Sequence, residues 1–247
     1  MDKIKEVKKW MDDAKHLVFF GGAGTSTASG IPDFRSENGV YHKEREDKLP
    51  PEFVLSHTYL KQDPDGFSKS YKKEYVFPDK EPNKLHYILT ELEEKGVLQA
   101  IITQNIDGLH QKAGSKNVLE IHGNMVDHYC VDCGKKFPLE YALAFEKSAT
   151  CDECCGFVRP DVVLYEEILP QGVFEEAIRQ VRQADVMIVA GTSLVVYPAA
   201  GLLQYYRGNR LILINKQETQ MDSMANAVFH DDIGDILEKI TETNHEN

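Results

Sequence analysis

Cysteine is missing from most of this chain. All five cysteines lie between Cys130 and Cys155, and the rest of the sequence contains none. A disulfide framework usually spreads its cysteines through the fold, and a reducing cytoplasm keeps them as thiols. The confinement of cysteine to one short region therefore disfavours disulfides and favours a bound metal ion.

Long hydrophobic runs are also missing. The longest runs, Val186 to Ala190 and Leu211 to Ile214, have the length of strands and fall far short of the roughly 20 residues that span a bilayer. The N-terminal sequence, MDKIKEVKKWMDD, is charged and amphipathic, unlike a secretory signal peptide. We therefore expect a cytoplasmic protein with no membrane partner.

Positive charge is scarce. Lys and Arg number 28 against 40 Asp and Glu, which gives a formal net charge of −12. Non-specific binding to nucleic acid depends on Lys and Arg contacts with phosphate, so we expect no direct nucleic-acid partner. The length of 247 residues suits one large domain, or one large and one small domain, and we expect a monomer.

A glycine-rich segment, GGAGTSTASG, directly follows the short apolar run Leu17 to Phe20. Gly22, Ala23 and Gly24 would let the backbone approach a pyrophosphate, and the N–H groups of a following helix would face the anion. The alternative is a tight strand-to-helix turn without a ligand. We predict dinucleotide binding. An ordinary dehydrogenase is disfavoured, because no second strand with an acidic end follows about 20 positions later.

Polar residues beyond this loop extend the candidate site. Ser26 and Thr27 add hydroxyl donors, and Arg35 suits a phosphate or a carboxylate. Phe34 would cover a flat ring. The alternative is that Asp33, Phe34 and Arg35 form a surface loop with one packed aromatic ring. Two later apolar runs also end in candidate nucleotide contacts, namely Gly191, Thr192 and Ser193 after the first and Asn215 and Lys216 after the second.

The stretch from Ile101 to Asn124 carries the strongest candidates for chemistry. One apolar pair leads into Gln104, Asn105 and Asp107, and a second leads to His122. Ligands usually bind at the carboxyl ends of strands in α/β sheets, and an amide, a carboxylate and an imidazole together form a plausible catalytic set. The alternative is that Asn105 and Asp107 cap a helix and His122 lies in a turn.

The cysteines fall into two CxxC pairs. Cys130 and Cys133 form one pair, Cys151 and Cys154 form the other, and residues 134–150 separate them. This spacing is typical of tetrahedral zinc held by four thiolates. With all four positions filled, the zinc would be structural. Scattered core cysteines would not explain the doubled spacing. Cys155 is ambiguous, either a buried thiol or a competing ligand.

Apolar runs of strand length alternate with helical patterns. We predict helices at 2–15, 51–62, 65–75, 83–95, 173–183, 197–206 and 232–241, and buried strands at 17–20, 162–165, 186–190 and 211–214, besides the apolar pairs of the 101–124 stretch. This alternation indicates an α/β protein with a Rossmann-like, doubly wound parallel sheet, a small zinc-ribbon domain and a helical insertion. The expected domains are a Rossmann-like dinucleotide-binding domain (1–36, 84–125 and 161–247), an insertion module (37–83) and a zinc-binding domain (126–160).

The chain resembles the sirtuins, the NAD-dependent protein-lysine deacylases, over nearly its whole length. The resemblance rests on GAGTSTASGIPDFRS (22–36), TQNIDGLHQKAG (103–114), EIHGN (120–124), the paired CxxC, RPDVV (159–163) and GTSLVVYPAA (191–200). The motifs occur in the order of the family, and their close spacing is similar to that of compact bacterial and archaeal members.

The resemblance implies a role for each matching residue. The NAD site would comprise Gly22, Ala23, Gly24, Ser26, Thr27, Asp33, Phe34 and Arg35 on the phosphate and ribose side, Gln104, Asn105, Ile106 and Asp107 at the nicotinamide, and Gly191, Thr192, Ser193, Asn215, Lys216 and Asp232 towards the adenosine. His122 and Asn105 would be catalytic, with His122 as the general base on a ribose hydroxyl. Zinc would bind Cys130, Cys133, Cys151 and Cys154, and an acyl-lysine peptide would lie along Val163, Tyr165, Glu166 and Val196.

The implied activity is removal of acetyl or other simple acyl groups from protein lysine, with NAD converted to nicotinamide and an O-acyl-ADP-ribose. The alternatives are protein ADP-ribosyl transfer, which cleaves NAD in the same way, and a binding module without catalysis. Three positions depart from the family. Gly21 replaces a usual Thr, Thr25 a usual Ile, and Glu166 a usual Gly, where a side chain would alter peptide pairing or favour basic residues beside the lysine. The Tyr-x-x-Arg pair of acid-accepting members has no match, because Glu74 stands where Arg would follow Tyr71.

Overall fold

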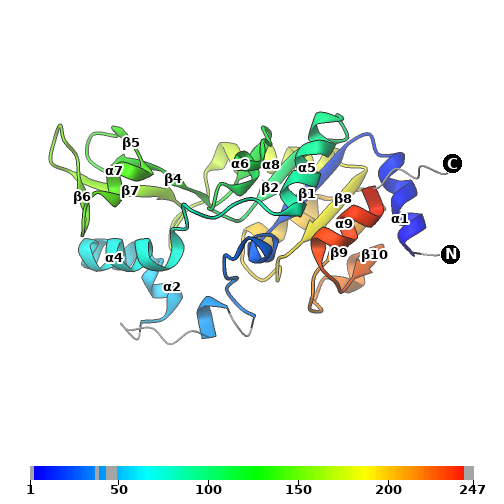
Figure 1. Cartoon of the computed structure of the whole chain (residues 1–247), viewed down its shortest axis with the longest axis horizontal. Coiled ribbons are helices and arrows are strands. Elements are labelled where there is room, and N and C mark those ends of the chain that lie inside the picture. Colours follow the sequence, from blue (N-terminus) through cyan, green and yellow to red (C-terminus); the bar gives the residue numbers. More distant parts are fainter. Residues whose placement is uncertain (1–2, 37–38, 43–48, 242–247) are drawn as a thin grey trace.

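A computed structural model describes residues 3–36, 39–42 and 49–241. Parts of the predicted insertion module, residues 37–38 and 43–48, lie outside the described residues. A six-stranded sheet occupies the end of the molecule at which both termini lie, and a four-stranded sheet occupies the opposite end (Figure 1). The six-stranded sheet corresponds to the predicted Rossmann-like sheet, and the four-stranded sheet corresponds to the predicted zinc-ribbon part.

The larger sheet is parallel and has the strand order β10-β9-β8-β1-β2-β3. Its strands are β1 (Leu17–Gly21), β2 (Leu98–Thr103), β3 (Val118–Glu120), β8 (Val186–Ala190), β9 (Leu211–Ile214) and β10 (Ala227–Phe229). β1, β8 and β9 are buried at every position, because helices cover both faces of the sheet. The doubly wound parallel sheet is confirmed, although β10 was not predicted.

Alternate side chains of the central strands enter two cores. Phe19 packs with α1 (Lys3–Asp12), α5 (Lys84–Glu94) and α9 (Ile233–Thr241) on one face. Phe20 packs with α8 (Gln171–Gln183) and the 3-10 helix η4 (Ala199–Tyr205) on the other face. These helices match the predicted ranges, except that η4 is a 3-10 helix.

The inserted segment contains α2 (Pro51–Val54), α3 (His57–Gln62) and α4 (Pro64–Tyr75). The single helix expected at 51–62 is two helices, because Ser56 interrupts it. The Ser56 backbone bridges to Tyr165, and its hydroxyl accepts the Tyr59 N–H at 3.0 Å as the N-cap of α3. Phe67 and Tyr71 of α4 pack in one core with Met125 and Val162 of the smaller sheet.

The smaller sheet is antiparallel, with the order β5-β4-β7-β6. It contains β4 (Gly123–Cys130), β5 (Lys136–Pro138), β6 (Ala149–Thr150) and β7 (Phe157–Val162), with α7 (Leu139–Leu143) packed against it. The buried strand predicted at 162–165 is wrong. The strand ends at Val162 and belongs to the smaller sheet, and Pro160 is tolerated within it because β6 pairs only as far as Val158.

Two histidines lie buried between α5 and α6 (Leu109–Ala113). His86 and His110 are 0% and 1% exposed, with ring centroids 4.7 Å apart. His86 Nδ1 accepts the Asn83 N–H, whereas His86 Nε2 and both nitrogens of His110 have no hydrogen-bond partner among the described residues. Burial lowers the pKa of His86 to about 4 and that of His110 to about 3.

We predict that this pair makes the fold sensitive to acid. Both folded-state pKa values lie below the usual 6.5, so stability is complete above pH 6.5 and is lost as the pH falls towards 4. At pH 5 each histidine would remove about 2 kcal/mol of the free energy of unfolding. Urea unfolding at pH 7 and pH 5 measures the loss. His110→Leu should show a smaller loss than the wild type, and equal losses would contradict the assignment.

Among the described residues, no helix is both long enough and apolar enough to cross a membrane.

Candidate functional site

A cavity of about 850 Å³ opens where four parallel strands end. Gly22 follows β1, Gln104 follows β2, Gly191 follows β8 and Asn215 follows β9. All residues predicted to bind cofactor or peptide line this cavity: Gly22, Ala23, Gly24, Ser26, Thr27, Asp33, Phe34, Arg35, Gln104, Asn105, Ile106, Asp107, His122, Val163, Tyr165, Glu166, Gly191, Thr192, Ser193, Val196, Asn215, Lys216 and Asp232. The carboxyl edge of a doubly wound sheet is where such proteins hold ligands.

The glycine-rich loop packs tightly against the loop after β8. The Gly24 N–H donates to the Gly191 carbonyl at 2.8 Å, and a Cβ on Gly24 would lie 2.6 Å from Gly191 Cα. Only glycine permits this approach. The expected helix after the loop is wrong, because two 3-10 turns, η1 (Ala23–Thr25) and η2 (Thr27–Ser29), follow instead. The loop therefore offers its own backbone and hydroxyl groups to the cavity, without the N-terminus of an α-helix.

Asn105 and Asp107 belong to one hydrogen-bond network with the glycine-rich loop. Asn105 Nδ2 donates to the hydroxyls of Thr25 and Ser26, both at 3.0 Å. Ser26 in turn donates to Asp107 Oδ2 at 2.6 Å, while Asp107 Oδ1 accepts the Leu109 N–H at 3.0 Å. Burial raises the pKa of Asp107, and these bonds oppose that rise. Asp107 therefore accepts a hydrogen bond from the first residue of α6, although the N-cap of that helix is Gly108, and it also joins the cavity network.

His122 lies between β3 and β4, where the chain passes from the larger sheet to the smaller one. Its Nδ1 lies 3.0 Å from the Gln104 carbonyl oxygen. Since a carbonyl only accepts, Nδ1 carries the proton and Nε2 keeps a free lone pair. Burial lowers the pKa of His122, against the Gln104 bond that raises it, so the ring is neutral at pH 7. The geometry suits a general base.

The segment after His122 is held closely to the strand beside it. The Val163 N–H donates to the His122 carbonyl at 2.9 Å, and Gly123 pairs with Val162. Gly123 has φ +71°, and a Cβ there would lie 2.0 Å from the Asp161 carbonyl oxygen. Glycine is therefore required beside His122 for both conformation and space.

Polar contacts join the loops that follow β2, β8 and β9 at the cavity. The Asn215 side chain accepts the Thr192 N–H at 3.0 Å and donates to the Thr192 carbonyl at 3.2 Å. Gln104 Nε2 donates to the Thr192 hydroxyl at 2.9 Å. Lys216 and Asp232 lie 3.5 Å apart as a partly exposed ion pair. Asn215 thus fixes the loop after β8, and Lys216 and Asp232 remain accessible at the rim.

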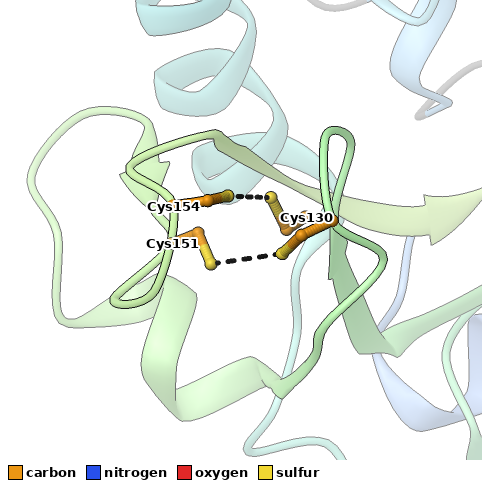
Figure 2. Close-up of side chains that lie close together, drawn as sticks. Cys130, Cys151 and Cys154 are labelled. Atoms are coloured by element: carbon orange, nitrogen blue, oxygen red, sulfur yellow. Dashed lines mark hydrogen bonds between the residues drawn. The ribbon is translucent and has the colours of Figure 1, made fainter.

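The four paired cysteines form a second candidate site, within the smaller sheet. Figure 2 shows the side chains of Cys130, Cys151 and Cys154 pointing towards one another. All four Sγ atoms, including that of Cys133, lie within 4.8 Å of one another. The Sγ atoms of Cys130 and Cys154 are 3.4 Å apart, and those of Cys133 and Cys151 are 3.6 Å apart. Zn–S bonds of about 2.3 Å in a tetrahedron place sulfurs about 3.8 Å apart, so the cluster fits zinc.

Cys155 has a different role from these four. It is exposed and does not belong to the sulfur cluster. Its φ is +61°, and its N–H donates to the Cys151 carbonyl at 3.0 Å. Gly134 has φ +75° and makes the same bond to Cys130. Cys155 therefore occupies the left-handed turn position of the second CxxC, which Gly134 fills in the first.

Comparison with known proteins identifies the family. The model of the Sir2 family matches residues 22–198. The chain belongs to the Sir2 family. It is 52% identical to an NAD-dependent protein deacetylase of Clostridium acetobutylicum, covering 97% of this chain and 98% of the relative, and 50% identical to one of Clostridium tetani, covering 98% of each.

Solved structures of Sir2 proteins share the fold. A complex of Sir2 with a p53 peptide and NAD+ superposes with a TM-score of 0.86 at 39% identity, covering 96% of each chain. A Sir2 protein bound to an acetylated peptide gives 0.84 at 38% identity, also covering 96% of each chain. These comparisons confirm the Rossmann-like fold with its small zinc-ribbon part.

In this Sir2 chain, the predicted peptide-binding segment is docked onto the helical insertion. The Tyr165 N–H donates to the Leu55 carbonyl at 2.8 Å, and the Tyr165 carbonyl accepts the His57 N–H at 3.1 Å. Glu166, at φ +75°, accepts both the N–H and the hydroxyl of Thr58, at 2.9 and 2.7 Å. The Glu166 carboxylate therefore caps α3, and the Tyr165 backbone is already paired.

A buried ion pair supports the same segment. Arg159, 5% exposed, makes a bidentate contact with Glu167, and Glu167 also accepts the Leu164 N–H at 2.9 Å. This pair was not predicted from the sequence, and neither were Thr25, Tyr41 and Asn83 as cavity residues. Asn83 caps α5 and donates to the Thr25 carbonyl at 2.9 Å. The Pro-Asn sequence at the start of that helix signals the cap, but no local pattern signals the long-range contact.

Proposed function

We propose that this protein removes acetyl groups from lysine side chains of proteins, with NAD as co-substrate. The observation that carries the proposal is the neutral His122, whose free Nε2 lines the same cavity as the glycine-rich loop and the Asn105–Asp107 network. The relatives at about 50% identity are NAD-dependent protein deacetylases, which supports this reaction over ADP-ribosyl transfer to protein.

The positions of the predicted residues in the cavity support one orientation of NAD. The nicotinamide and its ribose would lie against Gln104, Asn105, Ile106 and Asp107, near His122. The pyrophosphate would lie at the glycine-rich loop, with Arg35 exposed at its edge. The adenosine would reach Gly191–Ser193 and the accessible Lys216 and Asp232. The cavity is large enough for a ligand of this size.

NAD supplies a ribose carbon that is activated by the loss of nicotinamide, and that carbon accepts the acyl oxygen of the substrate. His122 Nε2 would withdraw a proton from a ribose hydroxyl, while the Gln104 carbonyl holds the imidazole in the required tautomer. The activated hydroxyl would attack the carbon of the bound acyl group, and one water molecule would be consumed as the bond from that carbon to the lysine nitrogen breaks. The products would be lysine, nicotinamide and O-acetyl-ADP-ribose.

The substrate is an acyl-lysine in an extended peptide. It would lie between the larger sheet and the smaller sheet, along Val163, Tyr165, Glu166 and Val196. Because the Tyr165 backbone is already paired with residues 55–57, Tyr165 would contact the peptide through its exposed side chain. Zinc at the four cysteines would hold the smaller sheet in shape without entering the reaction.

We further propose the domain division given by the sequence: an NAD-binding domain of residues 1–36, 84–125 and 161–247, an insertion of 37–83 and a zinc-binding domain of 126–160. The position of His122 at the passage from the larger sheet to the smaller one supports this division. We also propose a cytoplasmic monomer, since reduced, metal-bound cysteines suit that compartment.

The test is nicotinamide release from NAD, followed by mass spectrometry with and without an acetyl-lysine peptide. We expect release only with peptide, together with O-acetyl-ADP-ribose and free lysine. Release without peptide, or stable transfer of labelled ADP-ribose to protein, would contradict the deacetylase assignment.

A further inference from the structure

The side-chain amide of Asn105 is held by two hydroxyl groups whose own protons are already committed. Thr25 and Ser26 are 2% and 1% exposed. Each hydroxyl has one proton to donate and lone pairs to accept with. Which group of the amide faces them, N–H or C=O, therefore depends on where those two protons go.

The Thr25 proton is used within the glycine-rich loop. Thr25 Oγ1 donates to the Gly22 carbonyl at 2.7 Å, and a carbonyl has no proton to give back. Towards Asn105, 3.0 Å away, Thr25 is left with only a lone pair. The Asn105 group facing Thr25 must therefore be the N–H.

The Ser26 proton is committed in the same way. Ser26 Oγ donates to Asp107 Oδ2 at 2.6 Å and faces Asn105 Nδ2 at 3.0 Å with a lone pair. The two protons on Asn105 Nδ2 are thus both used. Asn105 Oδ1 has no hydrogen-bond partner among the described side chains and backbone groups, and Asn105 lines the cavity.

The Thr25 side chain is itself held in one orientation. A Cβ placed on Gly21 would lie 3.1 Å from Thr25 Cγ2, so the Thr25 methyl group packs over the space that Gly21 leaves open. With the methyl group there, the hydroxyl lies between the Gly22 carbonyl and Asn105. The space left open at Gly21 thus accommodates the Thr25 methyl group in the orientation that directs the Thr25 hydroxyl to Asn105.

We propose that Thr25 is a positioning residue that fixes the amide of Asn105 with its oxygen towards the cavity. The oxygen then serves as a hydrogen-bond acceptor for a hydroxyl group or a water molecule at the reacting ribose. Without Thr25 Oγ1, one Asn105 proton loses its acceptor, and Ser26 alone holds the amide in this orientation. This inference rests on the proposed function for its kinetic test and on the hydrogen-bond network alone for its spectroscopic test.

The kinetic test compares two variants of the full chain. Thr25→Val keeps the shape and removes the hydroxyl, whereas Thr25→Ser keeps the hydroxyl and removes the methyl group. We expect Thr25→Val to lower kcat for deacetylation of an acetyl-lysine peptide about tenfold or more, with the KM for NAD changed much less. Thr25→Ser should retain most of kcat. Equal kcat values for Thr25→Val and the wild type, or equal losses in both variants, would overturn the proposal.

A second comparison separates positioning from general damage to the fold. In an Asn105→Ala background, Thr25→Val should lower the remaining rate of nicotinamide release no further, because the group through which Thr25 acts is gone. A further loss of the size seen in the wild-type background would show that Thr25 acts on the fold and would contradict the proposal.

The spectroscopic test does not depend on activity. The side-chain amide signals of Asn105 in a ¹⁵N–¹H spectrum are assigned by their loss in Asn105→Ala. We expect these signals to shift in Thr25→Val and to stay near their wild-type positions in Thr25→Ser. Unchanged signals in Thr25→Val would overturn the proposal. A wild type without peptide-dependent nicotinamide release would instead contradict the proposed function, and the amide signals would still decide the role of Thr25.

Discussion

Replacement of His122 by Ala is expected to lower kcat for peptide deacetylation by about 10²- to 10⁴-fold, the usual contribution of a general base. The affinity for NAD should change little, because His122 contributes only one side of a cavity that many other residues line. Steady-state kinetics with an acetyl-lysine peptide gives kcat, and calorimetric titration with NAD gives the affinity.

A matched control is His16→Ala, directly before β1, because the His16 ring contacts Gln180 outside the cavity. Its kcat should equal that of the wild type. In the wild type, the acid limb of the kcat/KM profile should lie below pH 6.5, because burial lowers the pKa of His122 and the base is lost only when the ring protonates. A His122→Ala variant with full activity, or an acid limb well above pH 6.5, would exclude His122 as the base.

Removal of zinc is expected to unfold the smaller sheet. The four sulfurs join the β4–β5 turn to the segment between β6 and β7, and only a small core supports them. Structural zinc contributes about 10 to 16 kcal/mol of apparent binding free energy in small metal-dependent folds. Cys151→Ser, or a strong chelator, should therefore remove a large part of the thermal stability and abolish deacetylation.

Metal analysis should find one zinc per chain in the wild type and almost none in Cys151→Ser. The control is Cys155→Ser, which alters an exposed thiol outside the sulfur cluster and should keep both the metal and the wild-type melting temperature. A metal-free protein with an unchanged melting temperature would refute the structural role, and loss of zinc in Cys155→Ser would make Cys155 a ligand.

The sequence predicts those features that depend on residues close together along the chain. The buried strands at Leu17 and Val186 and the paired CxxC are recognisable because hydrophobic runs and ligand spacing are local patterns. The strand expected at 162–165 failed for a different reason. An apolar run shows that a segment is buried, but it does not show which sheet receives it, and here β7 pairs with β4.

The candidate site shows the same limit. Local patterns identified cavity residues such as Gly22, Gln104 and His122, and the family resemblance added Asp232 and the peptide-binding residues. They did not reveal that Thr25 and Asn105 share a hydrogen bond across 80 positions, or that the Glu166 carboxylate bonds to Thr58. Such contacts depend on how loops meet in space, and substitutions that depart from a family pattern acquire their meaning only there.

The close pairing of the two segments beside His122 has a mechanical consequence. Gly123 pairs in register with Val162, and the Val163 N–H donates to the His122 carbonyl, at the point where the chain passes between the sheets. These contacts tie the two segments together, so neither segment can shift without the other. Displacement of the smaller sheet would therefore reach the backbone beside His122, whose ring is held 3.0 Å from the Gln104 carbonyl oxygen.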